Sequence, residues 1–135
     1  MKKPLFQNKL IVKESPTHGY GVFAGKSLKK GELIEECYCL ISKKSGDKGL
    51  EDYYFDAKGQ SAIFLGFGCI YNHSDDANAD YDINLKTRIT TIKADRAIKK
   101  GEEIFVSYGD EWFKSRGLKP RHVTRKKQKS RQKKR

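Results

Sequence analysis

A single, mainly β domain is the fold class that this sequence predicts, and three observations lead to it. The chain has 135 residues, which suits one domain and is enough to bury a core without disulfide bonds. Its apolar residues fall in short runs rich in β-branched and aromatic side chains, and turns marked by glycine separate these runs. Helical periodicity is scarce, so many short strands and few short helices are expected.

Three strands are expected in the first half of the chain. Lys9 to Lys13 (KLIVK) is a short β-rich run that ends before the turn at Ser15-Pro16. Tyr20 to Ala24 has strand character again, and a turn with two lysines and a glycine leads into a longer strand, Leu33 to Ile41. The polar residues that follow, Ser42 to Gly49, predict a loop.

The second half is expected to be less regular. Leu50 to Phe67 mixes aromatic residues with short apolar pieces, and Asn72 to Asn84 is expected to be rich in loops. Thr87 to Ile92 (TRITTI) alternates as a strand does. A turn at Lys100-Gly101 precedes the last expected strand, Glu103 to Tyr108.

Polar side chains directly follow apolar, strand-like residues in two segments. Gly66 to Asn78 reads GFGCIYNHSDDAN, and Gly101 to Gly109 reads GEEIFVSYG. Side chains placed in this way are held by the apolar residues beside them, as a binding or catalytic constellation requires. Upstream, His18-Gly19-Tyr20-Gly21 adds two glycines whose lack of a Cβ lets a ligand approach the backbone closely. Together the three segments predict a binding or catalytic site.

The positive charge of the chain is concentrated at its C-terminal end. The formal net charge is +12, but residues 119–135 contain ten basic and no acidic side chains, so residues 1–118 carry only +2. We therefore expect a nearly neutral folded domain, residues 1–118, and a basic disordered tail, residues 119–135. The tail has three interpretations: a nuclear-import signal, a DNA or nucleosome contact driven by counterion release, or a solubilising end. Two basic clusters, Arg125 to Lys127 and Lys133 to Arg135, favour the first two, and the tail's lysines are also candidate methylation targets.

Membrane and secreted classes are not expected. No apolar run approaches the length of a membrane span, and the N-terminal MKKPLFQNKL lacks the apolar region of a secretory signal. An odd number of cysteines suits a reducing compartment. The sequence thus predicts a cytosolic or nuclear protein without a membrane partner.

The three cysteines leave a metal site as a secondary hypothesis. Cys37 and Cys39 share one face of a strand-like run, and Cys69 with His73 would complete a Cys3His zinc site. The spacing of Cys37 and Cys39 lacks the two-residue gap usual in structural zinc sites, and free cysteines commonly behave as small buried hydrophobes. No metal is therefore predicted.

The order of the motifs is similar to that of a known enzyme family. Gly19-Tyr20-Gly21, then Asn72-His73-Ser74 with Asn78, then Glu103 to Gly109 resembles the SET-domain protein lysine methyltransferases over about residues 9 to 113. The chain most resembles the minimal SET proteins of large algal viruses, which Leu50 to Tyr53 and Leu65 to Gly68 also match.

The resemblance implies a SET fold with small curved β-sheets and a C-terminal pseudoknot, in which the C-terminal segment threads under a loop containing Asn72 and His73. It implies S-adenosylmethionine as methyl donor. Residues His18, Gly19, Tyr20 and Gly21 would lie against the methionine part of this cofactor, and Asn72 and His73 would bind its amino and adenine parts. The cysteines that follow the domain and bind zinc in many relatives are absent, so Trp112 or Phe113 is expected to cover the cofactor.

By the same resemblance, Tyr108 is the catalytic tyrosine, and Tyr53, Tyr81 and Val106 line the channel for the substrate lysine. An apolar channel and a nearby sulfonium both lower the pKa of the lysine amine, so no strong general base is required. Val106 leaves room for more than one methyl group, whereas Tyr81 would restrict that room, and the number of methyl groups added stays open. Ala77 stands where many relatives have proline, which predicts a less rigid loop.

The function implied is methylation of lysine in histone or other basic tails, in the nucleus, with a homodimer left open. The alternative is a chromatin or nucleic-acid binding protein on a SET-like scaffold that has lost catalysis. Each residue also has a structural interpretation: Asn72 satisfies backbone groups in a buried turn, His73 is a loop histidine, and Tyr108 is a core tyrosine. Glu102-Glu103 is most simply an exposed charged turn, with pairing of Glu103 inside the fold as the alternative.

Overall fold

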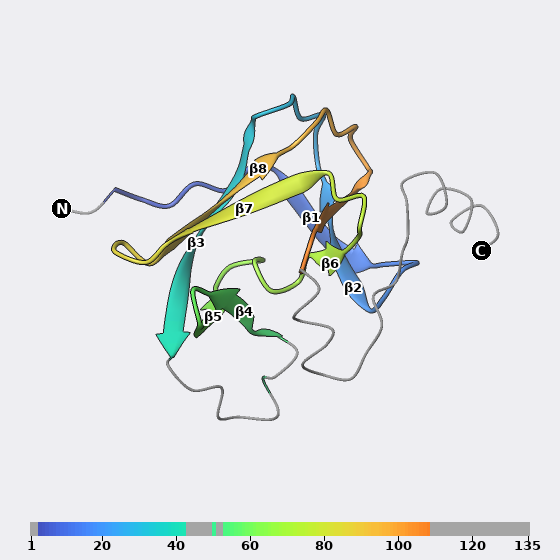
Figure 1. Ribbon diagram of the computed structural model, residues 1–135. Helices are drawn as coiled ribbons and strands as arrows, with labels where there is room; N and C mark the ends of the chain where they lie inside the picture. The colour runs from blue at the N-terminus through green and yellow to red at the C-terminus, as the bar shows by residue number, and fades with distance from the viewer. Residues whose placement is uncertain (1–2, 43–49, 51–52, 109–135) are drawn as a thin grey trace.

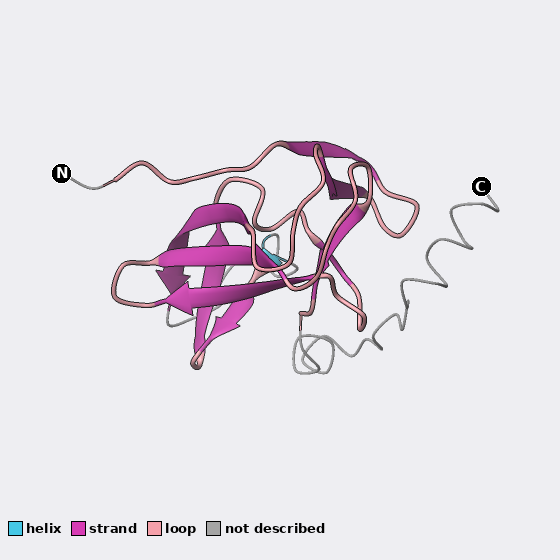
Figure 2. Ribbon diagram, turned by 90° about the horizontal axis from the view of Figure 1, so that it is seen from above, coloured by secondary structure: helices cyan, strands magenta, loops and turns pink. Residues whose placement is uncertain are grey.

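The computed structural model describes residues 3–42, 50 and 53–108, and these residues form two β-sheets (Figures 1 and 2). Their strands are β1 (Leu10–Glu14), β2 (Tyr20–Ala24), β3 (Leu33–Ser42), β4 (Phe55–Ala57), β5 (Gln60–Phe64), β6 (Asn72–His73), β7 (Ala79–Asn84), β8 (Ile89–Ala94) and β9 (Glu103–Val106). The described part contains no α-helix, and within it no helix has the length and apolar character of a membrane span.

The first sheet brings the three predicted site motifs together. Its strand order is β1-β2-β9-β6, so the strand after the glycine motif and the strand of Asn72 and His73 flank β9 on either side. β2 pairs with β9 antiparallel, whereas β6 runs parallel to β9, with Asn72 opposite Phe105 and His73 opposite Val106. Because the pair is parallel, residues after β9 lie beside residues after β6, and the Ser74 N–H donates to the Val106 carbonyl at 3.2 Å.

The second sheet has the order β4-β5-β3-β8-β7 and is built around the long strand β3. Ile34, Cys37 and Cys39 are buried, whereas Tyr38 and Leu40 face outward, as strand alternation requires. The alternation of buried and exposed side chains is interrupted once. The register against β8 shifts between Leu33 and Glu35, so two successive side chains, Ile34 and Glu35, are both buried.

This second sheet curls until its two edges approach each other. Phe55 on β4 and Phe64 on β5 contact Tyr81 on β7, with ring centroids 5.3 and 5.6 Å apart, although β4 and β7 are opposite edge strands. Figure 1 shows β7 and β8 passing across β3 while β4 and β5 lie to one side. The curvature collects aromatic rings from three strands inside the fold.

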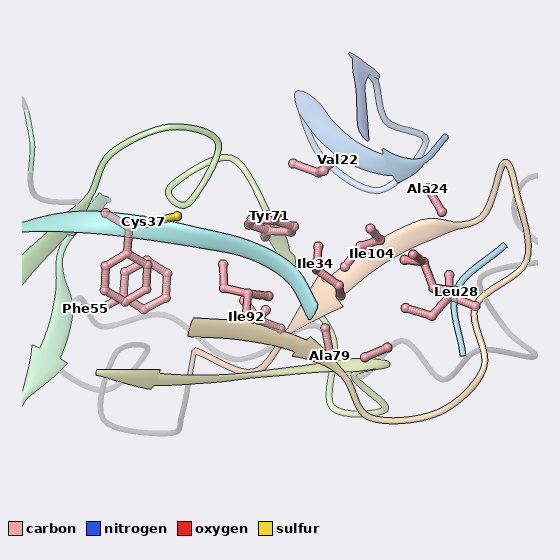
Figure 3. Packing of buried hydrophobic residues seen from close by; sticks show 14 of the residues in the cluster. Val22, Ala24, Leu28, Ile34, Cys37, Phe55, Tyr71, Ala79, Ile92 and Ile104 are labelled. Carbon is pink, nitrogen blue, oxygen red and sulfur yellow. The ribbon is translucent and has the colours of Figure 1, made fainter. Parts of the chain in front are cut away.

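One hydrophobic core joins the two sheets. Figure 3 shows Val22 and Ile104 from the first sheet near Ile34 and Ile92 from the second, with Tyr71 between them. Tyr71 is completely buried and immediately precedes β6. Packing against both sheets fixes the backbone from which the Asn72 and His73 side chains project.

The expected strands in the first half and the last strand are present, with small differences at their ends. The strand predicted at Thr87 begins at Ile89, because Arg88 adopts a left-handed φ of 60° in a turn closed by Asn84. The loop expected over Asn72 to Asn84 is wrong in part, since β6 and β7 lie within it. Aspartate and asparagine in ADYDIN suggest a loop, but Ala79, Tyr81 and Ile83 alternate inward and pair along β8.

Candidate active site

A cavity of about 440 Å³ lies at the turn between β1 and β2, lined by residues Glu14 to Tyr20. The turn is closed by the Ser15 N–H, which donates to the Gly19 carbonyl at 2.7 Å, and by the Thr17 N–H, which donates to Ser15 Oγ at 3.0 Å. The volume lies within the range of small-molecule sites in proteins.

The two glycines of the motif have different roles. Gly19 adopts a left-handed φ of 47°, and a Cβ built on it would meet no atom within 4 Å, so its backbone is open to a ligand. A Cβ on Gly21 would overlap Glu103 Oε2 and lie 3.0 Å from Asn72 Nδ2. Gly21 makes room for the protein's own side chains rather than for a ligand, and close approach of a ligand at Gly19 stays a prediction.

Asn72 ties the glycine motif to the first sheet. Its Nδ2 donates to the carbonyls of His18 and Tyr20 at 3.0 and 3.2 Å, and to Glu103 Oε2 at 2.8 Å. Asn72 thus satisfies backbone groups, as its structural interpretation held, and these groups belong to the wall of the cavity. A single amide fixes the turn that lines the cavity against β6 and β9.

Glu103 is the carboxylate beneath this turn. It is only 3% exposed, so its interpretation as part of an exposed charged turn is wrong, and its pairing inside the fold is confirmed. Its oxygens accept hydrogen bonds from Ser15 Oγ at 2.7 Å and Asn72 Nδ2 at 2.8 Å. Burial raises the pKa of Glu103, while the hydrogen bonds and the Lys13 charge act in the opposite direction.

His73 holds the backbone of the predicted catalytic residue. Its Nδ1 accepts the Tyr108 N–H at 2.9 Å, which places the ring proton on Nε2, where Asp75 Oδ1 lies 2.9 Å away and accepts it. His73 is buried. The histidine side chain therefore positions Tyr108, a role that the sequence did not indicate.

Tyr108 is held at three points. Its hydroxyl donates to the Tyr71 carbonyl at 2.6 Å, its N–H donates to His73, and its ring meets Phe55 edge-on at 5.6 Å. Tyr71 is itself anchored, because its hydroxyl donates to Glu35 Oε1 at 2.7 Å and burial raises its pKa well above the usual value. A hydroxyl whose proton is given to a carbonyl presents its oxygen as a hydrogen-bond acceptor.

An aromatic cluster surrounds Tyr108. Phe55 stacks on Phe64 with centroids 4.2 Å apart, and both contact Tyr81 edge-on. Burial raises the pKa of Tyr81, and the nearby charge of Asp56 adds to this effect. The structure thus places Tyr81 and Tyr108 in one aromatic environment, and Phe55 and Phe64, which the sequence did not single out, belong to it.

For the remaining predicted site residues that lie in the described part of the chain, the structure gives the burial but no contact that indicates a role. Tyr20 is 68% exposed beside the cavity, and His18, also on the cavity wall, is exposed. Tyr53 is about half exposed, and Val106 is buried in the core. The channel roles of Tyr53 and Val106 stay predictions. The expected cover, Trp112 or Phe113, and the basic tail lie outside the described residues.

The loop before β7 is more firmly held than its sequence suggested. Arg96 Nη2 donates to the carbonyls of Asp76 and Ala77 at 2.6 and 3.1 Å and lies 3.0 Å from the Asp76 carboxylate. Asn78 donates to the Glu103 carbonyl and accepts the Phe105 N–H. The rigidity that Ala77 lacks as a non-proline residue is supplied by these bonds.

The three cysteines and His73 do not form the zinc site that was the secondary hypothesis. No group of three metal-binding side chains occurs among the residues that the structure describes. Cys39 Sγ lies 2.7 Å from Thr90 Oγ1, and Cys69 Sγ donates to the Tyr53 carbonyl. Burial raises the pKa of all three thiols, that of Cys69 to about 11, which disfavours the thiolate that a metal requires.

Comparison with known proteins identifies this arrangement. The family model described as SET domain matches residues 19–109 of this chain. The chain belongs to the SET-domain family. The matched range contains the glycine motif, β6 and β9, so the three ordered motifs are part of the family pattern. The predicted fold, a mainly β SET domain with curved sheets, is confirmed. In the first sheet β9 lies between β2 and β6, and passage of the C-terminal segment under the loop that contains Asn72 and His73 stays a prediction.

Similar proteins include histone methyltransferases. The histone-lysine N-methyltransferase of Schizosaccharomyces pombe that is specific for histone H3 lysine-37 is 28% identical over 121 residues, which cover 84% of this chain and 82% of that protein. A solved candidate histone methyltransferase of Plasmodium falciparum is 33% identical, with a TM-score of 0.69, and the match covers 79% of this chain and 98% of that one.

A more distant likeness concerns the fold alone. A chain of the Chaetomium thermophilum Polycomb Repressive Complex 2, solved with S-adenosylmethionine, is 23% identical with a TM-score of 0.62. The match covers 78% of this chain but 16% of that one. It supports the SET topology of both sheets.

The site suits the cofactor of the SET family by its own geometry. The cavity has an open glycine backbone at Gly19, and its surrounding charges include the carboxylates of Glu14 and Glu103. These features accept a ligand with positive groups and a small-molecule volume. The residues present therefore fit S-adenosylmethionine.

Proposed function

We propose that this protein is an S-adenosylmethionine-dependent protein-lysine N-methyltransferase that acts on histone tails. The observation that carries the proposal is the position of the Tyr108 hydroxyl, which is fixed on the Tyr71 carbonyl beside an aromatic cluster. The same β6 and β9 that hold Tyr108 also hold Asn72 and Glu103 at the cavity wall. Cofactor and lysine would thus meet across one pair of strands.

The cofactor would be held by the turn and by β6. The wall from His18 to Tyr20 offers an open backbone at Gly19, and Asn72 keeps the carbonyls of His18 and Tyr20 in place. When bound, S-adenosylmethionine supplies a methyl group on a positively charged sulfur, ready for in-line attack by an amine.

The aromatic cluster would hold the substrate lysine. The Phe55 ring meets Tyr81 and Tyr108 edge-on, with centroids 5.3 and 5.6 Å away, and these rings can contact the alkyl stem and the cation. The ammonium must lose a proton before its nitrogen has a lone pair, and an apolar environment favours the neutral amine. The Tyr108 oxygen accepts an N–H of the amine and fixes the direction of its lone pair, so much of the rate gain comes from positioning.

A histone substrate is supported by the relatives and by the chemistry. The Schizosaccharomyces pombe relative acts on a lysine of histone H3. An aromatic cluster that would hold a lysine side chain suits a basic protein tail as substrate. The decisive experiment incubates the full chain with S-adenosylmethionine and purified core histones and reads the products by mass spectrometry. Methylated lysine on a histone tail is expected, and an unchanged histone mass together with measurable cofactor binding would contradict the proposal.

The catalytically inactive alternative receives no support from the site. A scaffold that had lost catalysis would not need the Tyr108 hydroxyl, yet this group is held together with its anchors Tyr71, His73 and Glu35. The two classes are separated by a chain lacking residues 119–135. An enzyme keeps its activity on a short peptide, whereas a binder driven by the tail loses its salt-dependent affinity for nucleic acid.

The basic segment 119–135 suits a nuclear enzyme. Its ten positive charges would favour nuclear import and contact with DNA or nucleosomes. Localisation of the full chain and of the chain without this segment tests both roles together with the nuclear location. A homodimer stays a prediction that sedimentation would test, and so does the particular likeness to the minimal SET proteins of algal viruses.

A further inference from the structure

The buried carboxylate of Glu103 is a charge that the proposed transfer step does not use. It lies directly behind the wall of the cavity, because its Oε1 accepts a hydrogen bond from Ser15 Oγ at 2.7 Å and Ser15 lines the cavity. A Cβ on Gly21 would overlap its other oxygen, so the carboxylate lies against the backbone of the turn.

The protein compensates this charge only in part. Both hydrogen-bond partners of the carboxylate, Ser15 and Asn72, are neutral. Lys13 attracts it from a distance, but the Lys13 ammonium lies over the Phe23 ring, 4.5 Å from the centroid. Within the described residues, no cation comes within ion-pair distance of Glu103. A buried carboxylate without a paired cation carries a desolvation cost, and the raised pKa of Glu103 reflects it.

The other charged side chains of the cavity do not reverse this sign. Glu14 and His18 line the wall, so the wall and the layer behind it hold two carboxylates and one imidazole, and the Lys13 ammonium over the Phe23 ring offsets part of this charge. Charges of one sign around a cavity favour a ligand of the opposite sign, and buried ones are screened least by salt.

We propose that Glu103 makes the cavity prefer the cationic methyl donor over its neutral product. This rests on the proposed function, because it takes S-adenosylmethionine as the ligand. S-adenosylmethionine carries one positive charge more than S-adenosylhomocysteine, since the sulfonium becomes a neutral thioether when the methyl group leaves. The two molecules otherwise offer the same groups to the cavity. A fixed buried negative charge therefore favours the donor and assists release of the product.

The effect is large enough to measure. A unit charge roughly 10 Å from another, across an effective dielectric constant of about 20, changes a binding constant by roughly tenfold. Glu103→Gln removes the charge but keeps the length of the side chain, an acceptor for Asn72 and a donor for Ser15. Glu102→Gln is the matched control, because Glu102 is the adjacent carboxylate but accepts the Lys99 N–H in an exposed turn.

The experiment measures dissociation constants of S-adenosylmethionine and S-adenosylhomocysteine by calorimetry for the wild-type chain and both variants. Glu103→Gln is expected to weaken donor binding by roughly tenfold and product binding by less than about threefold. Glu102→Gln is expected to leave both constants within about twofold, because the half-buried Glu102 carboxylate lies on a surface turn and is screened more than the buried Glu103.

Equal weakening of both ligands, or no change in either, would overturn the proposal and leave Glu103 a structural residue. Binding of neither ligand by the wild-type chain would instead contradict the proposed function. Should Glu103→Gln lack a cooperative thermal transition, Glu103→Met removes the same charge at similar volume, and the ratio of its two dissociation constants decides in the same way.

Discussion

Substitution of Gly21 by alanine perturbs the contact on which the cavity wall depends. A Cβ at this position would overlap Glu103 Oε2 and lie 3.0 Å from Asn72 Nδ2. To restore a van der Waals separation of about 3.5 Å, the carboxylate must move by roughly an ångström. Because it bonds Asn72 and Ser15 at 2.8 and 2.7 Å, a movement of that size breaks at least one of these hydrogen bonds.

The cost can be assembled from these changes. Loss of a hydrogen bond to a buried carboxylate costs about 1.5–3 kcal/mol. Overpacking adds about 1–3 kcal/mol. The reduced freedom of the unfolded chain offsets up to about 1 kcal/mol. The free energy of unfolding of Gly21→Ala is therefore expected to fall by about 1.5–6 kcal/mol.

Urea unfolding followed by circular dichroism measures this change, and Gly19→Ala is its control in the same turn. At Gly19 the added Cβ meets no atom within 4 Å, so only the left-handed φ of 47° opposes alanine. That strain costs about 1–2 kcal/mol. If Gly21→Ala is no more destabilising than Gly19→Ala, Glu103 and Asn72 do not occupy the space behind Gly21 and the description of the wall is wrong.

Three further predictions follow from the same contacts. Tyr71→Phe removes the hydrogen bond to Glu35 but keeps the carbonyl that holds Tyr108. Urea unfolding should show a loss of about 1–3 kcal/mol in the free energy of unfolding, while the methylation rate per folded molecule stays within about threefold. A hundredfold loss of that rate would contradict a purely stabilising role of the Tyr71 hydroxyl. Arg96→Met releases the carbonyls of the loop before β7 and should weaken cofactor binding, measured by calorimetry. Ala77→Pro in the Arg96→Met background should restore part of the lost affinity, because proline makes the loop more rigid. No change in affinity in either titration would show that other contacts hold the loop. Burial raises the pKa of Glu103 above its ordinary value of 4.5, so the folded state binds this proton more tightly than the unfolded state does. Thermal unfolding should therefore show the wild type gaining stability relative to Glu103→Gln as the pH falls from about 8 to about 4.5. A stability difference that is constant with pH, or that has the opposite slope, would refute the raised pKa.

The sequence was most informative where a residue type has few alternative uses. The strand expected at Leu33 to Ile41 formed because its residues Ile34, Cys37 and Cys39 are buried in the core. The order of the glycine motif, Asn72-His73 and Tyr108 predicted the SET-domain family from the sequence alone.

The sequence was least informative where distant segments decide a residue's role. Glu103 follows another acid after a lysine turn and looks exposed, but the pairing of β9 between β2 and β6 turns it inward. The His73 bond to the Tyr108 backbone depends on a parallel pair that no local pattern signals. Phe55 and Phe64 reach Tyr81 only because the second sheet curls. In each case tertiary contacts outweigh the local signal.

The most direct test of the central claim is single-turnover methyl transfer to a histone H3 tail peptide by the wild type and by Tyr108→Phe, with cofactor affinity measured in parallel. Tyr108→Phe keeps the ring that meets Phe55 and the N–H that bonds His73, and loses the hydroxyl that donates to the Tyr71 carbonyl and would orient the lysine amine. The wild type should transfer the methyl group, and Tyr108→Phe should bind the cofactor within about threefold but transfer at a rate lower by roughly a hundredfold or more. Equal rates for the two proteins would contradict the assignment of Tyr108 as the residue that positions the substrate.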